Sequence, residues 1–375
     1  MKPMFNKMKY YSLKNILSKN AQYNIIFGER SNGKSYAVLK YGIEAYAKTG
    51  EQMAIVRRWR EDFRGKRGQS LFSPLVENGV ISRVTNGKYD NVYYYAGKWY
   101  FSKFDEELNK NVIDENPFAW GFALTEMEHD KSTSYPKITT ILFDEFLTRN
   151  AYLPDEFVLF MNVVSTIVRY RDNVKIFMLG NTVNQYSPYF NEMGLKHISK
   201  MEKGDIDVYS YGDSKLRVAV EYADSPNKGK PSDIYFAFNA DGKSAAKLDM
   251  ITGGVWEMAL YPHCPVKYKP KEILFTYFIQ FDGNLLQCEI VQHEQMIFTF
   301  IHRKTTPLKN EEKDFLYTTE YSPQPNISRR LTRPLNNIEK RIWYFFSKEK
   351  VFYQDNEVGE IVRNYINWSN TETIK

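Results

Sequence analysis

The sequence predicts an α/β protein with a parallel sheet that carries a phosphate-binding loop at one edge, followed by a linker and a smaller second domain. Three observations support this fold class. Short apolar runs alternate with helical stretches between about residues 10 and 222, as they do in parallel α/β sheets. A G-x-x-x-x-G-K-S motif stands between a strand and a helix in NIIFGERSNGKSY, residues 24–36. An Asp-Glu pair follows the apolar run ITTILF, residues 138–143.

The composition is that of a folded protein with a mild excess of positive charge. The 375 residues are 43% hydrophobic and 16% aromatic, which is far from a disordered composition and allows two domains with their own cores. The 51 Lys and Arg exceed the 45 Asp and Glu and give a net charge of +6. This excess is compatible with a polyanionic partner, although DNA contacts would depend on local patches.

Neither a membrane segment nor a disulfide framework is expected. The N-terminus has no apolar stretch long enough for a signal peptide, and residues 273–281, the most apolar segment, are about half the length that spans a bilayer. We therefore expect a soluble, cytoplasmic protein with no membrane partner. Cys264 and Cys288 have no C-x-x-C spacing and are expected to be reduced thiols rather than a disulfide framework. A zinc site that would join them with His263 and His293 matches no known spacing, so structural roles are favoured.

The N-terminal domain is expected to alternate strands and helices. Continuous apolar runs, such as 174–180, are typical of strands covered on both faces. Pro154 suits the first turn of a helix, and Gly50 suits the end of another. We predict strands at 24–27, 52–58, 138–145 and 174–180, and helices at 34–48 and 154–171.

The remaining elements are an insertion and a separate C-terminal domain. Residues 80–124 resemble an antiparallel insertion, with a hairpin at 92–102 that turns at Ala96-Gly97. A cluster of Pro, Gly, Asn and Lys at 224–233 indicates a linker. Beyond it we expect a second hairpin at 273–291 and helices near 338–346 and 357–366. The predicted domains are 1–222, a linker region at 223–254, and 255–375.

The G-x-x-x-x-G-K-S motif predicts a site for a nucleotide triphosphate. Such a loop places successive backbone N–H groups around the β-phosphate at a helix N-terminus, whose dipole favours anions. Lys34 would reach the β- and γ-phosphate oxygens, and Ser35 would bind Mg²⁺. The candidate ATP-binding residues of the loop are Gly28, Arg30, Ser31, Asn32, Gly33, Lys34, Ser35 and Tyr36.

The Asp-Glu pair predicts hydrolysis of the bound nucleotide. Asp144 would stand at the end of its strand, where it can share Mg²⁺ with Ser35. Glu145 can orient and polarise a water molecule for attack on the γ-phosphorus. A nucleotide kinase does not need this group, because its acceptor supplies the nucleophile. The pair therefore favours hydrolysis that is coupled to movement.

The next strand adds a third feature at the same edge of the sheet. Asn181 follows the run 174–180 and could sense the γ-phosphate. The order of phosphate loop, Asp-Glu strand and Asn-tipped strand matches P-loop ATPases of the additional-strand, catalytic-glutamate type. Many such ATPases form rings in which an arginine of a neighbour completes the site, and Arg169 and Arg171 are candidates. Each is also compatible with an ordinary surface position.

Four stretches resemble the encapsidation proteins, the DNA-packaging ATPases of small podophages with protein-primed linear genomes. They are GERSNGKSYAVLKYGI, GEQMAIVRRWR, KSTSYPKITTILFDEF and IVRYRDNVKIFMLGNTVNQYSPYF, and the likeness covers most of residues 20–190. It implies a pentameric ring that pumps double-stranded DNA through the portal into an empty procapsid as ATP is hydrolysed. An RNA or protein adaptor could join the ring to the portal. The site of action would be the cytoplasm of an infected bacterium, transiently at the procapsid vertex.

The resemblance also implies roles for three basic residues. Arg169 corresponds to the arginine finger that acts in trans, and Lys131 to a lysine that also acts across the subunit interface. Arg60 corresponds to a lid residue over the nucleotide. Relatives carry lysine at that position, and the two side chains differ in geometry and hydration.

The resemblance implies that the C-terminal domain has a small α+β fold like that of ribonuclease H. This domain would be a vestigial nuclease that has lost its metal-binding acids. A working site needs a carboxylate in the middle of the first strand to hold a metal ion. Glu272 precedes the run 273–281, no acid lies within it, and Asp282 falls in the following turn. We therefore predict that this domain has no nuclease activity.

The DNA contacts are predicted only as patches. Lys and Arg in loops that face a ring channel would bind phosphates without reading bases. Arg64, Lys66 and Arg67 form one candidate patch, and 328–330 with Arg333 form another. A solvated surface is the ordinary alternative for both.

Three other functions share parts of this pattern. A terminase large subunit with an active nuclease would have the same N-terminal chemistry. A DNA pump of the chromosome or conjugation type would normally carry a membrane anchor. A nucleotide kinase or a switch protein would keep the phosphate loop without needing Glu145.

Overall fold

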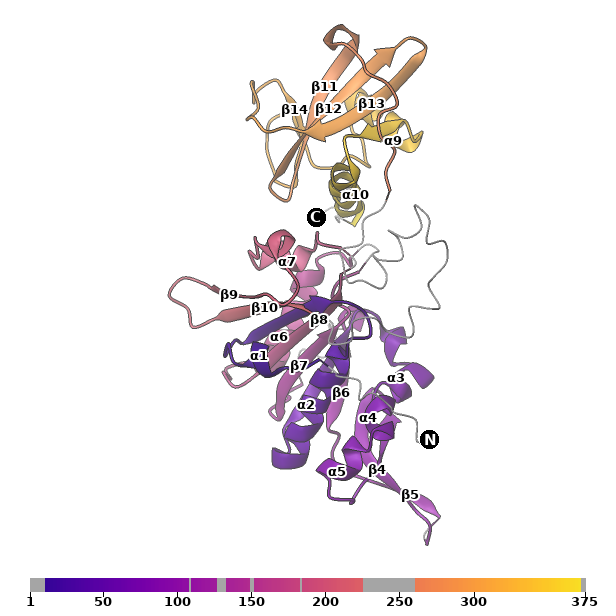
Figure 1. Ribbon diagram of the computed structural model, residues 1–375, viewed down its shortest axis with the longest axis vertical. Coiled ribbons are helices and arrows are strands. Elements are labelled where there is room, and N and C mark those ends of the chain that lie inside the picture. The colour runs from indigo at the N-terminus through magenta and orange to yellow at the C-terminus, as the bar shows by residue number, and fades with distance from the viewer. Residues whose placement is uncertain are drawn as a thin grey trace, which may run out of the picture. The chain divides into compact units, whose positions relative to one another are not determined.

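The structure is a computed structural model that describes residues 11–107, 109–126, 133–148, 152–182, 184–224 and 260–371. The chain divides into two compact units, residues 1–149 with 155–256, and residues 150–154 with 257–375 (Figure 1). Most of the linker predicted at 223–254 lies outside the described residues. The domain boundaries drawn from the sequence therefore stay a prediction.

The N-terminal unit contains a large sheet with helices and 3₁₀ turns around it (Figure 1). Its strands are β1 (Tyr23–Gly28), β2 (Gln52–Arg57), β3 (Asn91–Tyr95), β4 (Lys98–Asp105), β5 (Lys110–Ile113), β6 (Ala119–Ala123), β7 (Ile138–Asp144), β8 (Lys175–Asn181), β9 (Ile206–Ser210) and β10 (Arg217–Ala223). Its helices are α1 (Lys14–Leu17), α2 (Lys34–Thr49), α3 (Lys66–Ser70), α4 (Ser73–Glu77), α5 (Val80–Val84), α6 (Glu156–Val168) and α7 (Pro188–Glu192). Short 3₁₀ turns are η1 (Arg60–Phe63), η2 (Leu124–Glu126) and η3 (Ile198–Lys200).

The large sheet has the order β3-β4-β6-β2-β7-β8-β1-β10-β9, with β5 paired to β4. The central strands β6, β2, β7, β8, β1 and β10 are parallel. Strand β8 lies between the phosphate-loop strand β1 and the Asp-Glu strand β7. This inserted strand confirms the predicted fold of a P-loop ATPase of the additional-strand type.

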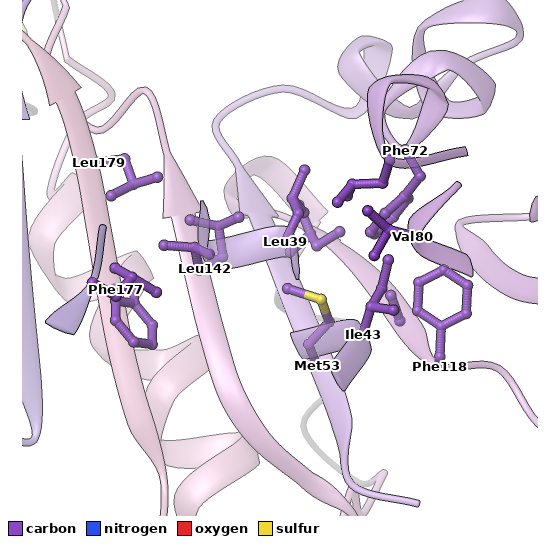
Figure 2. Close-up of a cluster of buried hydrophobic side chains, with 14 of the residues drawn as sticks. Leu39, Ile43, Met53, Phe72, Val80, Phe118, Leu142, Phe177 and Leu179 are labelled. Atoms are coloured by element: carbon purple, nitrogen blue, oxygen red, sulfur yellow. The ribbon is translucent and has the colours of Figure 1, made fainter. Parts of the chain in front are cut away.

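Helix α2 packs one face of the sheet and fixes the position of the loop that precedes it. Leu39 and Ile43 are buried among Met53 and side chains from α4, α5 and β6 (Figure 2). Gly42 permits this close approach, because a Cβ atom there would lie 2.5 Å from the Met53 sulfur. Gly50 ends the helix with φ 76°, a left-handed conformation that glycine adopts without strain.

The four central strands and both helices predicted for this unit are present, with small differences at their ends. Helix α6 ends at Val168 rather than at 171, because Arg169 has a φ of 48° that interrupts the helix. Strand β10, which the sequence analysis missed, pairs in parallel with β1 from Tyr23–Val218 to Gly28–Ala223.

The predicted antiparallel insertion is correct for the hairpin and for the antiparallel pairing of β4 with β6, and wrong for residues 80–84. Strands β3 and β4 pair antiparallel around Ala96-Gly97, as expected. Residues 80–84, however, form helix α5, and β6 pairs in parallel with β2. The apolar run of β6, with Ala119 and Phe122 buried, suits a strand covered on both faces. It joins the insertion to the main sheet.

The C-terminal unit contains a second sheet of order β15-β14-β11-β12-β13-β16. Its elements are η5 (Pro270–Glu272), β11 (Ile273–Phe281), β12 (Asn284–His293), β13 (Met296–Arg303), β14 (Phe315–Tyr317), β15 (Ile327–Ser328), α9 (Asn337–Ser347), β16 (Val351–Tyr353) and α10 (Asn356–Thr371). Strands β11, β12 and β13 form an antiparallel meander, and β14 and β15 extend it in parallel beside β11. This arrangement agrees with the small α+β fold that the sequence predicts, and β16 pairs in parallel with β13 at the other edge.

The predicted hairpin at 273–291 and both terminal helices are present in this unit. Asn336 caps α9 by accepting a hydrogen bond from the Glu339 backbone N–H. Cys264 and Cys288 are free thiols, and the described residues contain no group of three or more His, Cys, Asp or Glu side chains that could hold a metal ion. Among the described helices, none combines the length and apolar character needed to cross a membrane.

Candidate nucleotide-binding site

The phosphate loop, the Asp-Glu pair and Asn181 meet where the three parallel strands β1, β7 and β8 end. In the strand registers, Gly28 of β1 lies beside Asn181 of β8, and Asp144 of β7 lies beside Leu179 of β8. Ligands of open α/β sheets bind at this carboxyl edge, because the loops diverge there. The structure therefore brings together residues that are more than 100 positions apart in the sequence.

The loop between β1 and α2 has the geometry of an anion-binding turn. Ser31 and Gly33 adopt positive φ values of 58° and 92°, which turn successive N–H groups toward one side of the loop. The Asn32 side chain is buried and accepts a hydrogen bond from the Lys34 backbone N–H at 3.2 Å. This bond ties the loop to the first turn of α2.

Lys34 lies folded within the loop. Its side chain is buried, and Nζ donates to the carbonyl oxygens of Glu29 at 2.6 Å and Gly28 at 3.4 Å. A phosphate that enters the loop could replace these two carbonyl acceptors.

The close approach of strand β10 requires a glycine at position 28. A Cβ atom at this position would lie 2.6 Å from the Ala223 carbonyl oxygen of β10. The Gly28 carbonyl oxygen also accepts a hydrogen bond from the Thr182 N–H at 3.3 Å. The start of the loop is thus enclosed between the ends of β8 and β10.

Ser35 and Asp144 fit a shared Mg²⁺ ion. The Ser35 hydroxyl donates to Asp144 Oδ1 at 3.1 Å. Two oxygen ligands in adjacent positions around Mg²⁺, each about 2.1 Å from the ion, stand about 3.0 Å apart. Both are hard oxygen donors, so the pair could hold this ion with little rearrangement.

Arg57 is a site residue that the sequence analysis missed. It ends β2 and bridges both acids, with Nη2 at 2.8 Å from Asp144 Oδ2 and Nη1 at 3.0 Å from Glu145 Oε2. The Arg57 side chain is 16% exposed and the Glu145 side chain 67% exposed. Its signal in the sequence was a basic residue directly after an apolar strand, the same pattern that identified Asp144.

Arg58 forms a second arginine network behind the acids. Its Nε and Nη2 atoms lie 2.7 and 2.8 Å from the two carboxylate oxygens of Glu156. It also donates to the carbonyl oxygens of Phe146 and Glu145 at 3.0 and 3.4 Å. The sequence analysis did not single out either member of this pair.

A hydroxyl–carboxyl pair supports the loop from the other side. Tyr11 donates its backbone N–H to the Asn32 carbonyl oxygen at 3.1 Å and its hydroxyl to Glu221 of β10. Burial raises the pKa of the Glu221 carboxyl above its usual range. The loop is thereby tied to β10, the strand that the sequence analysis had not found.

The candidate arginine finger does not lie at this edge. The guanidinium of Arg169 donates to the Thr133 carbonyl oxygen at 2.9 Å, and Arg171 donates to those of Pro136 and Tyr135 at 2.9 and 3.3 Å. Residues 133–136 precede β7, so both arginines lie at the amino edge of the sheet. The two edges are about 20 Å apart, because this is the length of strand β8.

The other basic candidates have separate positions. Arg60 lies in η1 and forms an ion pair with Glu126, and Lys131 lies outside the described residues. Arg64, Lys66 and Arg67 are exposed around the start of α3. In that patch Arg64 lies 3.7 Å from Glu61, and Arg67 lies 3.9 Å from Asp62.

The C-terminal patch and the predicted inert nuclease strand can also be located. Arg329 stacks on the Tyr321 ring with its guanidinium 3.4 Å from the ring centre, and Arg333 is exposed. Within β11 no residue is acidic, while Glu272 before it binds His293 at 2.7 Å. Glu272 is therefore engaged in an ion pair within the unit, and Asp282 lies in the turn after β11.

Comparison with known proteins supports the resemblance seen in the sequence. A family model described as "Podovirus DNA encapsidation protein (Gp16)" matches residues 5–73 and 91–230. The DNA packaging protein of Bacillus phage B103 is 30% identical over 183 residues, which are 48% of this chain and 50% of that protein. The DNA packaging protein of Bacillus phage phi29 is 29% identical over 192 residues, 49% of this chain and 50% of that protein.

The chain spans about half the length of the curated relatives it matches. A solved structure extends the likeness in fold to both units. The Phi-28 gp11 DNA packaging motor aligns with a TM-score of 0.55 and 17% identity, covering 98% of this chain and 99% of that chain. The family match includes the phosphate loop, the Asp-Glu strand and the Asn-tipped strand. The chain therefore belongs to the podovirus DNA encapsidation protein family.

Proposed function

We propose that this protein is an ATP-hydrolysing motor that translocates double-stranded DNA and packages a viral genome into a procapsid through the portal. The observation that carries the proposal is the Ser35–Asp144 pair beside Glu145, at the mouth of a phosphate loop. Membership of the encapsidation family supports the same activity. The matched proteins of phages B103 and phi29 are named DNA packaging proteins.

The loop residues bind the triphosphate of ATP. Backbone N–H groups from Gly28 to Ser35 surround the β-phosphate, and Lys34 exchanges its two carbonyl acceptors for phosphate oxygens. Ser35 and Asp144 would hold the Mg²⁺ that accompanies ATP, and this ion would offset the negative charge of the phosphates. Arg60, from the turn after β2, covers the nucleotide as part of a lid.

Glu145 orients and polarises the water that attacks the γ-phosphorus. Arg57 holds this carboxylate and Oδ2 of Asp144, which leaves Oδ1 of Asp144 beside the Ser35 hydroxyl as the oxygen that would bind Mg²⁺. Asn181 ends β8 beside Gly28 and is half-buried, where its amide can detect the γ-phosphate. Loss of that phosphate then relaxes the grip of the subunit on DNA.

Arg169 acts on the site of a neighbouring subunit in a homo-oligomeric ring. Its place at the amino edge of the sheet, about 20 Å from its own phosphate loop, supports action in trans. An arginine there offsets charge that develops on the transferred phosphoryl group. Lys131 acts across the same interface, and the ring is a pentamer.

The exposed residues Arg64, Lys66 and Arg67 contact DNA phosphates, and the C-terminal unit is an inactive nuclease that helps to dock the ring. The partners are double-stranded DNA and the portal of a procapsid, reached directly or through an RNA or protein adaptor. The ring assembles in the cytoplasm of the infected host and binds the procapsid vertex transiently.

The test is the rate of ATP hydrolysis, measured alone, with double-stranded DNA, with procapsids, and with both. We expect stimulation by DNA and procapsids together, and uptake of DNA into nuclease-protected particles. A rate that responds to neither addition would contradict the proposal. Cleavage of plasmid DNA in Mn²⁺ would instead favour a terminase with an active nuclease.

A further inference from the structure

The Arg58–Glu156 pair is a buried bidentate ion pair next to the site. The side chains are 9% and 0% exposed, and two N–H groups of the guanidinium meet the two carboxylate oxygens at 2.7 and 2.8 Å. The Tyr189 hydroxyl donates a further hydrogen bond to Glu156 at 2.8 Å. Such pairs are geometrically specific, because the two N–H groups of the guanidinium can meet both carboxylate oxygens in only one orientation. Neither residue reaches the phosphate loop in the described contacts.

The guanidinium of Arg58 also holds the backbone at Glu145. It donates to the carbonyl oxygens of Phe146 and Glu145 at 3.0 and 3.4 Å. Glu145 has a φ of 62°, in the left-handed region that a glutamate adopts only when its surroundings impose it. On the other side, the Phe146 N–H donates to the Leu179 carbonyl oxygen of β8 at 3.1 Å. Arg58 and β8 therefore hold the turn that aims the Glu145 carboxylate.

The same pair holds the start of helix α6. Glu156 is the first residue of this helix, which runs for 13 residues to Val168 and is followed directly by Arg169. A helix of this length is a rigid rod of about 20 Å. The ion pair thus links the turn at Glu145 to the element that carries Arg169 at the opposite edge of the sheet.

We propose that Arg58 and Glu156 are positioning residues shared by two active sites. They hold Glu145 in the attacking geometry of their own subunit, and through α6 they fix the place of Arg169 in the site of the neighbour. The first part requires hydrolysis at this site, and the second rests on the proposed trans role of Arg169. A purely structural role would instead affect only the stability of the unit.

The cis part is tested with Glu156→Gln, which keeps the size of the side chain and removes its charge. We expect kcat for ATP to fall roughly 10- to 100-fold, because a displacement near 1 Å has this effect on positioned groups. The affinity for a non-hydrolysable ATP analogue should stay within about twofold of the unaltered protein, because the phosphate loop is untouched. An unchanged kcat in the folded variant would overturn this part.

A matched control is Glu360→Gln in the C-terminal unit. Glu360 is also buried and also accepts a hydrogen bond from a tyrosine, Tyr261, at 2.7 Å. Its replacement should leave kcat unchanged. A loss of kcat equal to that of Glu156→Gln would show that removal of any buried glutamate has this effect, and would contradict the proposal.

If Glu156→Gln fails to fold, the double variant Arg58→Met with Glu156→Leu decides the cis part. An apolar pair of similar volume commonly replaces a buried ion pair without loss of stability. The variant should bind the ATP analogue with kcat still at least about tenfold low, because nothing then holds the Glu145 turn. Full recovery of kcat would mean that the pair serves only the fold.

The trans part is tested in mixed rings. Rings made only of Arg169→Ala subunits, or only of Glu145→Gln subunits, should be inactive. Mixed rings should regain hydrolysis, because a Glu145→Gln subunit supplies Arg169 to the intact Glu145 site of a neighbouring Arg169→Ala subunit. Glu156→Gln is then added to the Glu145→Gln subunit, whose own site is already inactive. We expect the restored rate to fall at least about fivefold, since the finger is displaced.

An undiminished rate in the second mixture would overturn the coupling through α6 while the proposed function stands. If the first mixture stays inactive, the trans role of Arg169 is wrong and the trans part falls with it. The cis part would still be decided by Glu156→Gln alone. The two proposals therefore fail by different observations.

Discussion

The two sheets of this chain use carboxylates in opposite ways. Asp144 and Glu145 stand at the end of β7, where their partners are Arg57 and the Ser35 hydroxyl. Glu289 lies in the middle of β12, is 8% exposed, and is bound by Tyr268 and His302 within the same unit. One pair of acids lies at a strand end beside the helix that follows the phosphate loop, and the other acid is enclosed by its own unit.

This contrast shows that position in the strand matters more than residue type. At a strand end the backbone diverges, so a carboxylate can exchange one partner for a metal ion or water. Within a strand, neighbours on both sides occupy the oxygens. Substitutions at the edge of the first sheet should therefore change catalysis, whereas those in the second sheet should change only stability.

Glu145→Gln should have the largest effect. The amide keeps the shape of the side chain but cannot polarise the attacking water, so kcat should fall by about 10²–10⁴. Binding of Mg·ATP should change little, because Lys34, Ser35 and Asp144 remain. Steady-state hydrolysis and equilibrium binding of a fluorescent ATP analogue are the measurements. Hydrolysis that survives this change would mean that another group activates the water.

Arg57→Met should have the next largest effect. Without the guanidinium, Glu145 loses its partner at 3.0 Å and Asp144 its partner at 2.8 Å, so the two acids lose the cation that fixes their positions. We expect kcat to fall about 10- to 100-fold. The Mg²⁺ concentration that gives half the maximal rate should also fall, because a positive charge no longer lies beside the carboxylate that would hold the ion. Arg83→Met, an exposed change on α5, is the control.

Gly28→Ala should lower the stability of the N-terminal unit. The new Cβ would meet the Ala223 carbonyl oxygen at 2.6 Å, and overpacking of this kind costs about 1–3 kcal/mol. Gly212→Ala is a matched control, since it also has a positive φ, 54°, but no atom within 4 Å of the new Cβ. Denaturant midpoints should show the larger loss for Gly28→Ala, and equal losses would contradict the steric argument.

The contacts that are local in sequence could be predicted, and those that depend on a distant partner could not. The phosphate loop and the Asp-Glu strand are encoded in short continuous patterns, so their position at one edge followed from strand order. Arg57 and Arg58 lie in the pattern RRW, which indicates an end of a strand but not which acid each will face. Strand β10 was missed because its pairing with β1 joins residues almost 200 positions apart.

In the insertion, too, local pairings could be predicted from the sequence and distant pairings could not. The hairpin of β3 and β4 was predictable because Ala96-Gly97 marks its turn. The parallel pairing of β6 with β2 has no local signal, because an apolar run of five residues suits either direction. The partner of a strand, unlike its existence, is decided by packing over the whole sheet.

The smallest expected effect is the pH dependence of the second sheet, where Glu289 lies 3.4 Å from His302. The hydrogen bond to Glu289 raises the pKa of His302 from its ordinary 6.5, although burial acts in the opposite direction. Burial alone would raise the pKa of Glu289, but hydrogen bonds from His302, Tyr268 and Gln287 outweigh it and hold this pKa below 4.5. The pair therefore stabilises the unit when both groups are charged.

The directions of the two pKa shifts define a pH range in which the pair stabilises the unit most. The His302 contribution is complete below its unfolded pKa near 6.5 and is lost as pH rises through the raised folded value. The Glu289 contribution is complete above its unfolded pKa near 4.5 and is lost as pH falls through the lowered folded value. We expect the protection factors of the amides in β12 and β13, which are corrected for the intrinsic pH dependence of exchange, to be largest between these values, with a gain below about 1 kcal/mol after screening by solvent. In His302→Gln the loss of protection above pH 6.5 should disappear, and an unchanged profile would mean that another group titrates there.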